Sequence, residues 1–416
     1  MRPFYYLFIT LYPIAARVLS LFNKKARLWV RGRKDVMEDV YHYFNSNTAP
    51  VIWFHCASLG EFEQGRPVLE NLKADYPKHK ILITFFSPSG YEIRKNYKLA
   101  DFICYLPMDS PLNAKRFVNV VRPSLVVFIK YEFWFYYLKA IRKRNIPLLL
   151  VSGLFRNDQL FFKSWGGFYR RMLRYFTHLF VQTHDALQLL QSIKITNASV
   201  SGDTRFDRVL ATVQHFEPVP LIEAFCGDKK VIVAGSTWTE DDEELDHFVI
   251  THPDMRFIIA PHDISEERLK ECERLYKHTI RYSSLAKAQN TAGINTLIID
   301  NIGMLSRLYK YATICYVGGA FGGDGIHNIL EPAVFAKPVL FGPAHDKFPE
   351  AGELIEEGGA YSVENALELE KTLNELINNE EMYLQSCAAS IHYIQRNIGA
   401  TEKVIQYIQE KRLLTS

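Results

Sequence analysis

The sequence has little cysteine and no clustered histidine. Its six cysteines are scattered along the chain, and no Cys-X-X-Cys pair occurs among them. Disulfide-dependent domains pack many cysteines into a short chain, and zinc sites need closely spaced Cys or His ligands. We therefore expect neither a disulfide scaffold nor a zinc site, and we expect the chain to work in a reducing compartment.

Net charge is also small. The formal charge of +3 over 416 residues is too little to argue by itself for a nucleic-acid partner. Intrinsic disorder is excluded, because 48% of the residues are hydrophobic and disordered chains lack the apolar surface that offsets ordering entropy. At about 150 residues per domain, the length favours two domains or three. Aromatic residues reach 13% and indicate large apolar or sugar-like contact surfaces.

No long apolar run is free of interruption. The most apolar segment, residues 3–22, contains Pro13 and Arg17, and no small-residue cleavage site follows it. Residues 1–35 carry eight cations and one acid, so their charge is +7 and the other 381 residues sum to −4. This combination is typical of a helix in a membrane interface with its cations near anionic lipid. The alternatives are a spanning helix whose basic flank faces the cytoplasm, and a core-docked helix with a solvated basic tail.

From residue 50 onward, short apolar runs alternate with segments of helical length, as in buried parallel strands of βαβ units. The first series of predicted strands is 51–55, 81–86, 102–107, 125–130, 148–153 and 178–183. A segment with two prolines and a glycine then predicts a linker at 218–229. The second series is 231–236, 257–262, 297–300, 313–319 and 338–342. The predicted fold class is α/β, with two doubly wound, Rossmann-like domains in tandem.

Ligands of such sheets bind beyond the carboxyl ends of the strands, so the loops there are the candidate sites. After the first strand, small residues including Ser58 and Gly60 lead to Glu61, near the start of a helix. A carboxylate there can act as a general base toward a hydroxyl nucleophile. It can equally serve only to complement the helix dipole.

Two other loops of the first series carry charge. Lys130 and Glu132 follow a strand among apolar neighbours, where they form either a structural arrangement or part of a site. Arg205 can hold a phosphate or a sugar carboxylate with two hydrogen bonds, or it can pair with Asp207 at the surface.

Two loops that follow strands of the second predicted series are suited to bind anions. Ser236 and Thr237 lead into an acid-rich helix start, whose acids at 240–244 are expected to form a solvated face. In the stretch 317–332, VGGAFGGDGIHNILEP, five glycines allow backbone N–H groups to approach phosphate oxygens closely. Glu331, one turn into the following helix, is placed to accept hydrogen bonds from ribose hydroxyls. The spacing matches neither a P-loop nor GxGxxG, and it predicts a nucleotide or sugar-nucleotide site.

In their order and spacing, several blocks make the chain resemble the 3-deoxy-D-manno-octulosonic acid (Kdo) transferases of Gram-negative bacteria. They are WFHCASLGE (53–61), YEFW (131–134), SGDTRFD (201–207), AGST (234–237), IIAPH (258–262), GGDGIHNILEP (322–332) and FGPAHDKF (341–348). The resemblance runs nearly end to end and includes the apolar, basic N-terminus. It implies an inverting glycosyltransferase of the GT-B fold, with two Rossmann-like domains facing a cleft. It also implies transfer of Kdo from CMP-Kdo to a lipid A precursor (lipid IVA) in lipopolysaccharide core biosynthesis.

The resemblance implies roles for individual residues. Glu61 falls on the catalytic base, and Glu132 and Arg205 fall on positions that stabilise the transition state. The CMP-binding residues would be Pro261, His262, Ile302, Gly303, Met304, Asn328, Ile329, Leu330 and Glu331. We expect further ligand contacts from Ser58, Gly60, Ser236 and Thr237. No metal or other cofactor is expected, because CMP is a good leaving group and Kdo carries its own carboxylate.

Three positions depart from the family pattern. Pro261-His262-Asp263 stands where Pro-Arg-His is usual, so an Arg contact to the nucleotide is missing or supplied elsewhere. Lys347 stands where Asn is usual, and Glu132 is followed by Phe-Trp-Phe where Leu-Trp-Pro is more common.

We expect the following division of the chain. Residues 1–35 form a membrane-anchoring helix, 36–217 the acceptor-binding domain, 218–229 the linker, and 230–395 the CMP-sugar-binding domain. Residues 396–416 form a C-terminal helix, with a return to the first domain as one option. The aromatic and basic stretch 161–176 either docks acyl chains and sugar phosphates or forms a buried helix with one basic face.

The expected location is the cytoplasmic side of the inner membrane, either anchored or peripheral. The expected partners are CMP-Kdo and the lipid A precursor, without nucleic acid. Two alternatives stay open: another GT-B enzyme with a different nucleotide sugar, such as a UDP-sugar, and a non-catalytic membrane-bound sugar-nucleotide sensor.

Overall fold

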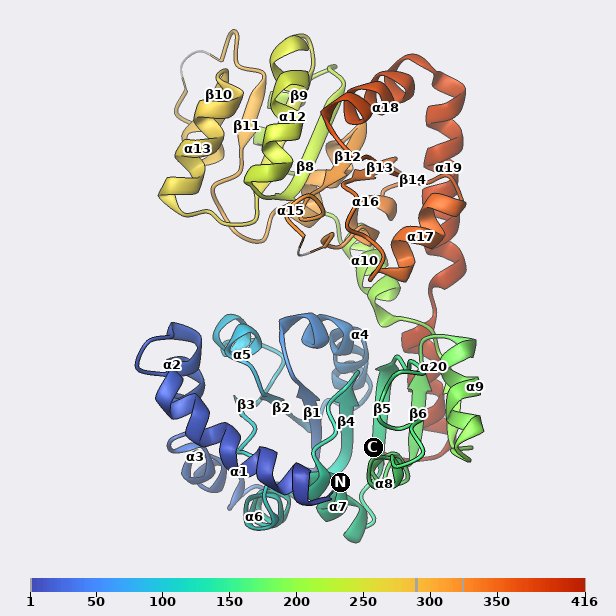
Figure 1. The fold of residues 1–416 in the computed structure, drawn as a ribbon. Coiled ribbons are helices and arrows are strands. Elements are labelled where there is room, and N and C mark those ends of the chain that lie inside the picture. The colour runs from blue at the N-terminus through green and yellow to red at the C-terminus, as the bar shows by residue number, and fades with distance from the viewer. Residues whose placement is uncertain (1, 289–290, 324, 416) are drawn as a thin grey trace. The chain divides into compact units, whose positions relative to one another are not determined.

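The computed structural model describes residues 2–288, 291–323 and 325–415, which belong to two compact units (Figure 1). The first unit comprises Met1–Arg208 and Ile398–Ser416, and the second comprises Val209–Asn397. Each unit contains one seven-stranded sheet, and the strand pairs of the described residues are parallel in both sheets. The predicted α/β class with two Rossmann-like parallel sheets is confirmed.

The sheet of the first unit has the strand order β3-β2-β1-β4-β5-β6-β7. Its strands are β1 (Val51–Cys56), β2 (Lys80–Phe85), β3 (Phe102–Tyr105), β4 (Pro123–Ile129), β5 (Leu148–Gly153), β6 (His178–Val181) and β7 (Ala198–Val200). The helices between them are α4 (Leu59–Asp75), α5 (Pro88–Arg94), α6 (Pro111–Val121), α7 (Phe135–Lys143), α8 (Gly167–Leu173) and α9 (His184–Ser192). From β1 the next strands are added toward one edge of the sheet, and from its parallel neighbour β4 they are added toward the other edge.

The first sheet is buried on both faces, which explains its continuous apolar strands. In β1, Trp53 belongs to one core cluster, whereas its neighbours Ile52 and Phe54 belong to the opposite one. This alternation follows from the two-residue period of a strand. Helix α20 (Ala400–Glu410) adds Val404 and Ile408 to the second of these clusters, so the C-terminal segment is part of the first unit.

Three helices precede the first sheet: α1 (Arg2–Leu19), α2 (Lys24–Arg31) and α3 (Val36–Phe44). We expect residues 1–35 to form a membrane-anchoring helix. The structure has two helices there, α1 and α2, and Tyr5 and Ile9 of α1 are buried in a core cluster of the first unit. Tyr5 also donates a hydrogen bond to the buried carboxylate of Asp109 at 2.5 Å.

The sheet of the second unit has the order β10-β11-β9-β8-β12-β13-β14. Its strands are β8 (Val231–Thr237), β9 (Arg256–Pro261), β10 (Thr279–Arg281), β11 (Thr296–Ile298), β12 (Ile314–Val317), β13 (Val339–Phe341) and β14 (Ala360–Ser362). The helices are α12 (Thr239–Thr251), α13 (Glu266–Tyr276), α14 (Tyr282–Leu285), α15 (Leu305–Leu308), α16 (Leu330–Ala333), α17 (Pro349–Glu356), α18 (Ala366–Asn378) and α19 (Glu380–Asn397). A single 3-10 turn, Tyr309–Tyr311, precedes β12.

Two expected boundaries differ from the structure. The units divide within helix α10 (Thr204–Gln214), so residues 209–217 belong to the second unit. The segment expected as a linker contains helix α11 (Pro220–Cys226), with Ile222 and Phe225 buried. Proline is well tolerated in the first turn of a helix, so Pro220 begins a helix here and does not mark a loop.

Candidate active site

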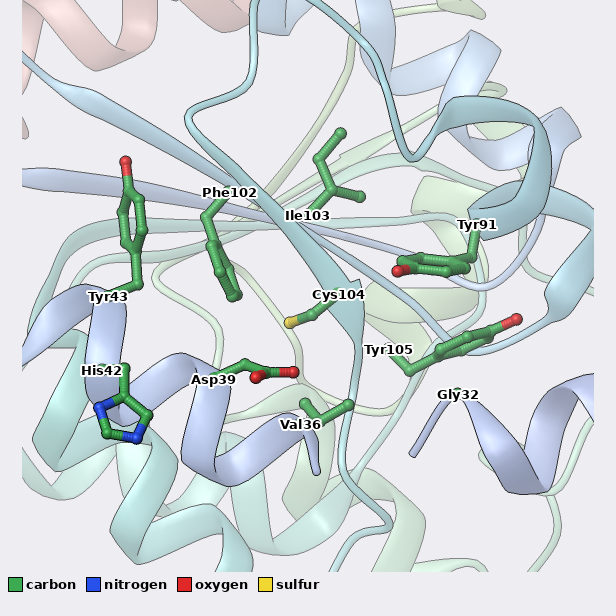
Figure 2. Close-up of a pocket in the computed structure, with 10 residues that line it drawn as sticks. All are labelled: Gly32, Val36, Asp39, His42, Tyr43, Tyr91, Phe102, Ile103, Cys104 and Tyr105. Carbon is green, nitrogen blue, oxygen red and sulfur yellow. The ribbon is translucent and has the colours of Figure 1, made fainter. Parts of the chain in front are cut away.

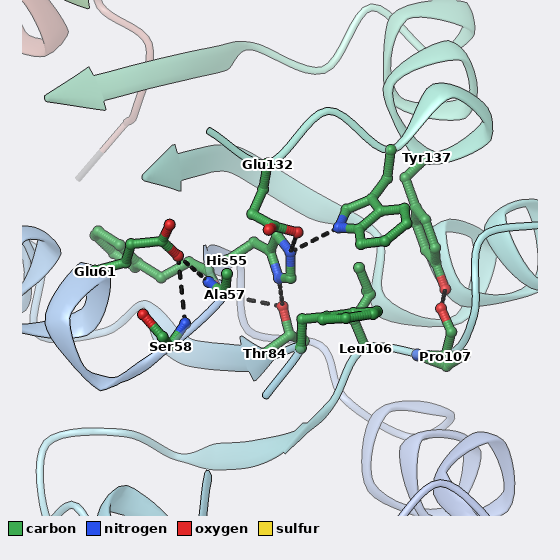
Figure 3. Close-up of polar contacts among 12 residues, drawn as sticks. His55, Ala57, Ser58, Glu61, Thr84, Leu106, Pro107, Glu132 and Tyr137 are labelled. Carbon is green, nitrogen blue, oxygen red and sulfur yellow. Dashed lines mark hydrogen bonds and ion pairs between the residues drawn. The ribbon is translucent and has the colours of Figure 1, made fainter. Parts of the chain in front are cut away.

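Two of the predicted catalytic residues of the first unit follow β1 and β4. These strands are neighbours in the sheet, but the chain continues from them in opposite directions, toward β2 and toward β5. Ligands of open parallel sheets bind at such a switch point. Glu61 follows β1 and Glu132 follows β4, so the topology brings the two carboxylates to the same region (Figure 3).

Glu61 lies in the first turn of α4, whose N-cap residue is Ser58. Its Oε2 accepts hydrogen bonds from the backbone N–H of Ala57 and, at 3.3 Å, from that of Ser58. The capping role that the sequence left open is therefore real. This role leaves Oε1 available to accept a proton, because both bonds use Oε2 and none of the described residues donates to Oε1. A Cβ placed on Gly60 would meet nothing within 4 Å, so the space beside this turn is open.

The environment of Glu61 suits proton transfer at neutral pH. Burial, followed by the negative charge of Glu132, raises the pKa of Glu61 to about 7. The two backbone donors and Lys130 act in the opposite direction. A carboxyl group with a pKa near the working pH is half deprotonated there, which is the favourable condition for a general base.

Glu132 contacts a histidine to which we had assigned no role. His55 is fully buried in β1, and its Nε2 lies 3.3 Å from Glu132 Oε2. The indole N–H of Trp134 donates to the same Nε2 at 3.2 Å, and His55 Nδ1 lies 2.8 Å from Thr84 Oγ1 (Figure 3). A fully buried ionisable side chain at the end of a strand was the signal that could have identified it.

These contacts indicate where the protons lie. Thr84 Oγ1 accepts from the indole of Trp53 at 2.8 Å and directs its own proton to a backbone carbonyl, so His55 Nδ1 is its second donor. His55 Nε2 in turn accepts from Trp134, which makes the imidazole neutral. Glu132 Oε2 lies beside the same Nε2, so His55 and Trp134 together hold the loop that follows β4.

Arg205 lies in the first turn of α10 and is held by an acidic neighbour. Its Nε and Nη2 lie 2.8 Å and 2.7 Å from Asp203 Oδ2. Asp203 thus orients the guanidinium. Asp207 accepts hydrogen bonds from the backbone N–H groups of Gly399 and Thr401, each at 2.6 Å, and so fixes the start of α20.

Tyr131 shows that Arg205 and Glu61 share one electrostatic environment. Burial is the main cause that raises the pKa of Tyr131, the charge of Glu61 adds to it, and Arg156 and Arg205 oppose it. Glu61, Arg156 and Arg205 thus all act on the Tyr131 hydroxyl, and Arg156 is a cation that we did not predict from the sequence.

In the second unit, the predicted anion-binding loops follow β8 and β12, which are again the neighbours at a switch point. Asp241 joins the two loops: its Oδ2 accepts from the backbone N–H groups of Trp238 and Gly319, both at 2.8 Å. Its Oδ1 accepts from the Tyr316 hydroxyl at 2.7 Å. A Cβ on Gly318 would lie 2.6 Å from Ser236 O, so glycine is required for this close approach. Asp324 of the glycine-rich motif lies outside the described residues.

The expectation that the acids at 240–244 form a solvated face is wrong for two of them. Asp241 and Asp242 are fully buried. Asp242 forms an ion pair with Arg268 and accepts a hydrogen bond from the Tyr276 hydroxyl at 2.7 Å. Buried carboxylates need such partners, and here they connect α12 to α13 and to the glycine-rich loop.

Among the predicted nucleotide-binding residues, His262 takes part in a stack of three rings. It lies 4.7 Å from the Trp238 ring and 4.5 Å from the His327 ring, measured between centroids, with interplanar angles of 27° and 21°. Its backbone N–H donates to Thr237 O at 3.0 Å. Pro261 is buried at the end of β9, whereas His262 is exposed. The stack brings the loops after β8, β9 and β12 together.

The remaining predicted nucleotide contacts lie on two other segments. Asn328 Nδ2 donates to Glu331 Oε1 at 3.2 Å, and Asn328 Oδ1 accepts from Leu330 N–H at 3.2 Å. Helix α16 has only four residues, so Glu331 lies in its first turn and not one turn into a longer helix. Ile329 and Leu330 are buried. In the loop after β11, Ile302 is 87% exposed and Met304 is buried.

The structure places Glu61, Glu132 and Arg205 in the first unit and all the predicted CMP-binding residues in the second. No group of three His, Cys, Asp or Glu side chains suited to a metal occurs in the part of the chain that the structure describes. A pocket of about 560 Å³ beside β3 contains Asp39, His42 and Cys104 (Figure 2), but none of the predicted catalytic residues lines it.

The N-terminal helices carry an unusual surface. Ten of the nineteen large apolar side chains that are exposed in the described residues lie between Phe4 and Phe22. Over the described ranges, no helix combines the length and the apolar character needed to cross a bilayer. In the stretch 161–176, Phe161, Leu173 and Phe176 are buried and Trp165 is exposed, so its aromatic residues mostly belong to the core.

Comparison with known proteins identifies relatives of the chain. Residues 34–208 match the family model of 3-deoxy-D-manno-octulosonic-acid transferase (kdotransferase). The 3-deoxy-D-manno-octulosonic acid transferase of Rickettsia bellii is 27% identical over 98% of this chain and 99% of its own length. That of Aquifex aeolicus is 27% identical over 80% of this chain and 87% of its own. A bifunctional glycosyltransferase/methyltransferase of Fusobacterium nucleatum is 28% identical over 85% of this chain, which spans only 57% of that protein.

Solved structures with similar folds have low sequence identity. UDP-GlcNAc 2-epimerase from Neisseria meningitidis, bound to UDP-GlcNAc, superimposes with a TM-score of 0.63 at 17% identity and covers 87% of this chain and 100% of its own. A glycosyltransferase from Rickettsia africae gives a TM-score of 0.54 at 17% identity, covering 88% and 99%. At these identities the likeness shows the fold alone.

Proposed function

The chain belongs to the 3-deoxy-D-manno-octulosonic acid (Kdo) transferase family, and from this premise we propose that it transfers Kdo from CMP-Kdo to the lipid A precursor lipid IVA. It is a glycosyltransferase with the GT-B fold. The proposed setting is lipopolysaccharide biosynthesis at the cytoplasmic face of the inner membrane.

The observation that carries the proposal is the geometry of Glu61. It combines a backbone-held Oε2, an Oε1 to which no described residue donates, and a pKa raised by burial to about 7. Glu61 would remove the proton from the acceptor hydroxyl as the oxygen attacks the anomeric carbon of Kdo. The bond from that carbon to the CMP phosphate breaks in the same step, and CMP leaves with the electron pair. One in-line displacement inverts the anomeric configuration.

Glu132 and Arg205 would act on the charge that develops at the sugar. Arg205, oriented by Asp203, can bind a carboxylate or a phosphate with two parallel hydrogen bonds. The carboxyl group of Glu132 lies 3.3 Å from Nε2 of the buried His55, which helps to fix its position. Such preorganised charges stabilise a transition state without reorganising during the reaction.

CMP would bind to the second unit. The glycine-rich loop held by Asp241 offers backbone N–H groups for the phosphate. Glu331 is proposed to accept hydrogen bonds from the ribose hydroxyls, with Asn328 holding its carboxylate. The ring stack of Trp238, His262 and His327 supplies imidazole groups beside this loop, where the departure from Pro-Arg-His removes an arginine. No metal is expected to take part.

The N-terminal surface supports the proposed location. Exposed apolar side chains of α1 and the exposed cations of α2, including Lys24 and Lys25, suit the interface of a membrane with anionic lipid. In this interpretation the helix lies in the interface while Tyr5 and Ile9 keep it attached to the core.

Two assays test the proposal against its alternatives. Thermal unfolding in the presence of CMP or UDP distinguishes the donors, and stabilisation by UDP but not by CMP would favour a different nucleotide sugar. Release of CMP from CMP-Kdo should depend on added lipid IVA. A sensor without catalytic activity would bind CMP-Kdo, would not release CMP, and would tolerate loss of Glu61.

A further inference from the structure

A pocket of about 380 Å³ lies between α1, α2 and the turn that precedes α5. One face of α1 forms a wall of it, because Tyr12, Ala15 and Leu19 recur at helical spacing. Trp29 of α2 and Phe86 of the turn form another part of the lining. The size falls within the usual range of small-ligand sites, about 300–1,000 Å³. The lining is apolar except for a few side chains such as Lys25.

The pocket continues an exposed apolar surface. Leu19, which lines the pocket, is 56% exposed, and its neighbours Leu11, Ile14 and Val18 on α1 are 50%, 52% and 58% exposed. A contiguous apolar surface of this kind marks a site of association with a membrane or another apolar partner. The exposed cations Lys24 and Lys25 stand beside it and favour an anionic partner.

The Trp29 ring presents apolar surface to the pocket. Its indole nitrogen is buried and has no hydrogen-bond partner in the part of the chain that the structure describes. Because that nitrogen is buried, the part of the ring that lines the pocket is carbon. Such a lining suits an aliphatic chain, which needs no hydrogen bond.

The pocket shares a wall with the turn that holds Glu61. Ser87, which lines the pocket, donates its backbone N–H to Ala57 O at 2.7 Å, and the N–H of Ala57 donates to Glu61. The ring of Phe86 packs against that of Trp134 with centroids 4.8 Å apart, and Trp134 donates to His55. A ligand in the pocket therefore lies against the elements that position the catalytic residues.

We propose that this pocket binds one fatty acyl chain of the acceptor glycolipid, with the anionic head group near Lys25. The inference rests on the proposed function, since it specifies the acceptor as an acylated, anionic lipid. The chain enters from the membrane side along the exposed face of α1. Its burial holds the sugar head group at the first unit and so positions the hydroxyl for Glu61.

Filling the pocket tests the proposal. Ala15 is exposed on α1 and lines the pocket, so Ala15→Trp fills it without disturbing the core. Leu112→Trp adds the same ring to an exposed position of α6, away from the pocket and from α1, and is the control. Ala15→Trp should raise KM for tetraacylated lipid IVA in detergent about tenfold, the effect of losing two buried methylene groups. Its affinity for CMP and its melting temperature should match those of Leu112→Trp.

A direct measurement separates failure of this proposal from failure of the proposed function. Wild-type protein is irradiated in bicelles that contain lipid IVA with a diazirine on one acyl chain, and the adducts are mapped by mass spectrometry. Adducts on Leu19, Trp29 or Phe86, lost in Ala15→Trp, support the proposal whether or not Kdo is transferred. Adducts confined to Phe4–Leu11, or an unchanged KM in Ala15→Trp when the wild type is active, would overturn it.

Discussion

Replacing Glu132 with glutamine should shift the pH dependence of turnover. The negative charge of Glu132 is one of the causes that raise the pKa of Glu61 from 4.5 to about 7, a change worth about 3 kcal/mol of ionisation free energy. Burial is the larger cause and remains in the variant. We therefore expect the pKa of Glu61 to fall in Glu132→Gln and to stay above 4.5.

The sign of the effect follows from the role of Glu61. A general base works in its deprotonated form, so kcat/KM rises with pH up to the pKa of Glu61 and then levels. The wild-type profile, measured between about pH 5 and 9, should bend near 7, and that of Glu132→Gln should bend at lower pH although its rate is reduced. Glu63→Gln is the matched control, because Glu63 lies on the same helix and pairs with Arg94 at 2.6 Å. A bend that stays near pH 7 in Glu132→Gln would refute the electrostatic coupling.

Four further predictions concern the site and the surface. Glu61→Gln should lower turnover by about 100-fold or more without changing CMP affinity by titration calorimetry. In the same variant the free energy of unfolding at pH 8 should exceed that of the wild type by up to about 3 kcal/mol, because the buried side chain of Glu61 ionises there at a cost that glutamine does not have. Chemical denaturation should show that this gain disappears below about pH 4.5. Glu331→Ala should weaken CMP binding more than it changes the melting temperature, and an unchanged Kd would remove its ribose role. Replacing Leu7, Leu11 and Ile14 together by glutamine should reduce liposome flotation and activity on bilayers more than activity in detergent, because these side chains are exposed and the core contacts of α1 are kept.

The sequence predicted the central strands well because they are continuously apolar. Strands β7, β10 and β14 were missed, and each has three residues with polar members: Ala198–Val200, Thr279–Arg281 and Ala360–Ser362. Such short strands depend on pairing with a neighbour already in place, which local composition does not reveal. Helix α11 was missed because proline is common both in linkers and in the first turn of a helix, and the sequence alone does not distinguish the two.

The sequence identified Glu61, Glu132 and Arg205 as site residues but did not identify the side chains that hold them or act on them. His55 acts through a contact between residues far apart in the chain, its 3.3 Å contact with Glu132. Asp203 lies only two residues from Arg205, but Asp207 is equally near in the sequence, so spacing could not choose between them. The burial of Asp241 was also unpredictable locally, because five consecutive acids are usually solvated, whereas here a loop 78 residues away supplies a donor. Tertiary pairing of this kind cannot be inferred from spacing alone.

The most direct test of the proposed function is the mass of the acceptor after reaction. Full-length protein is incubated with CMP-Kdo and lipid IVA in detergent, and the lipid is analysed by mass spectrometry beside a reaction with Glu61→Gln. We predict lipid that carries one or more Kdo residues with the wild type and little or none with the variant. Unmodified lipid from wild-type protein that demonstrably binds CMP would contradict the assignment.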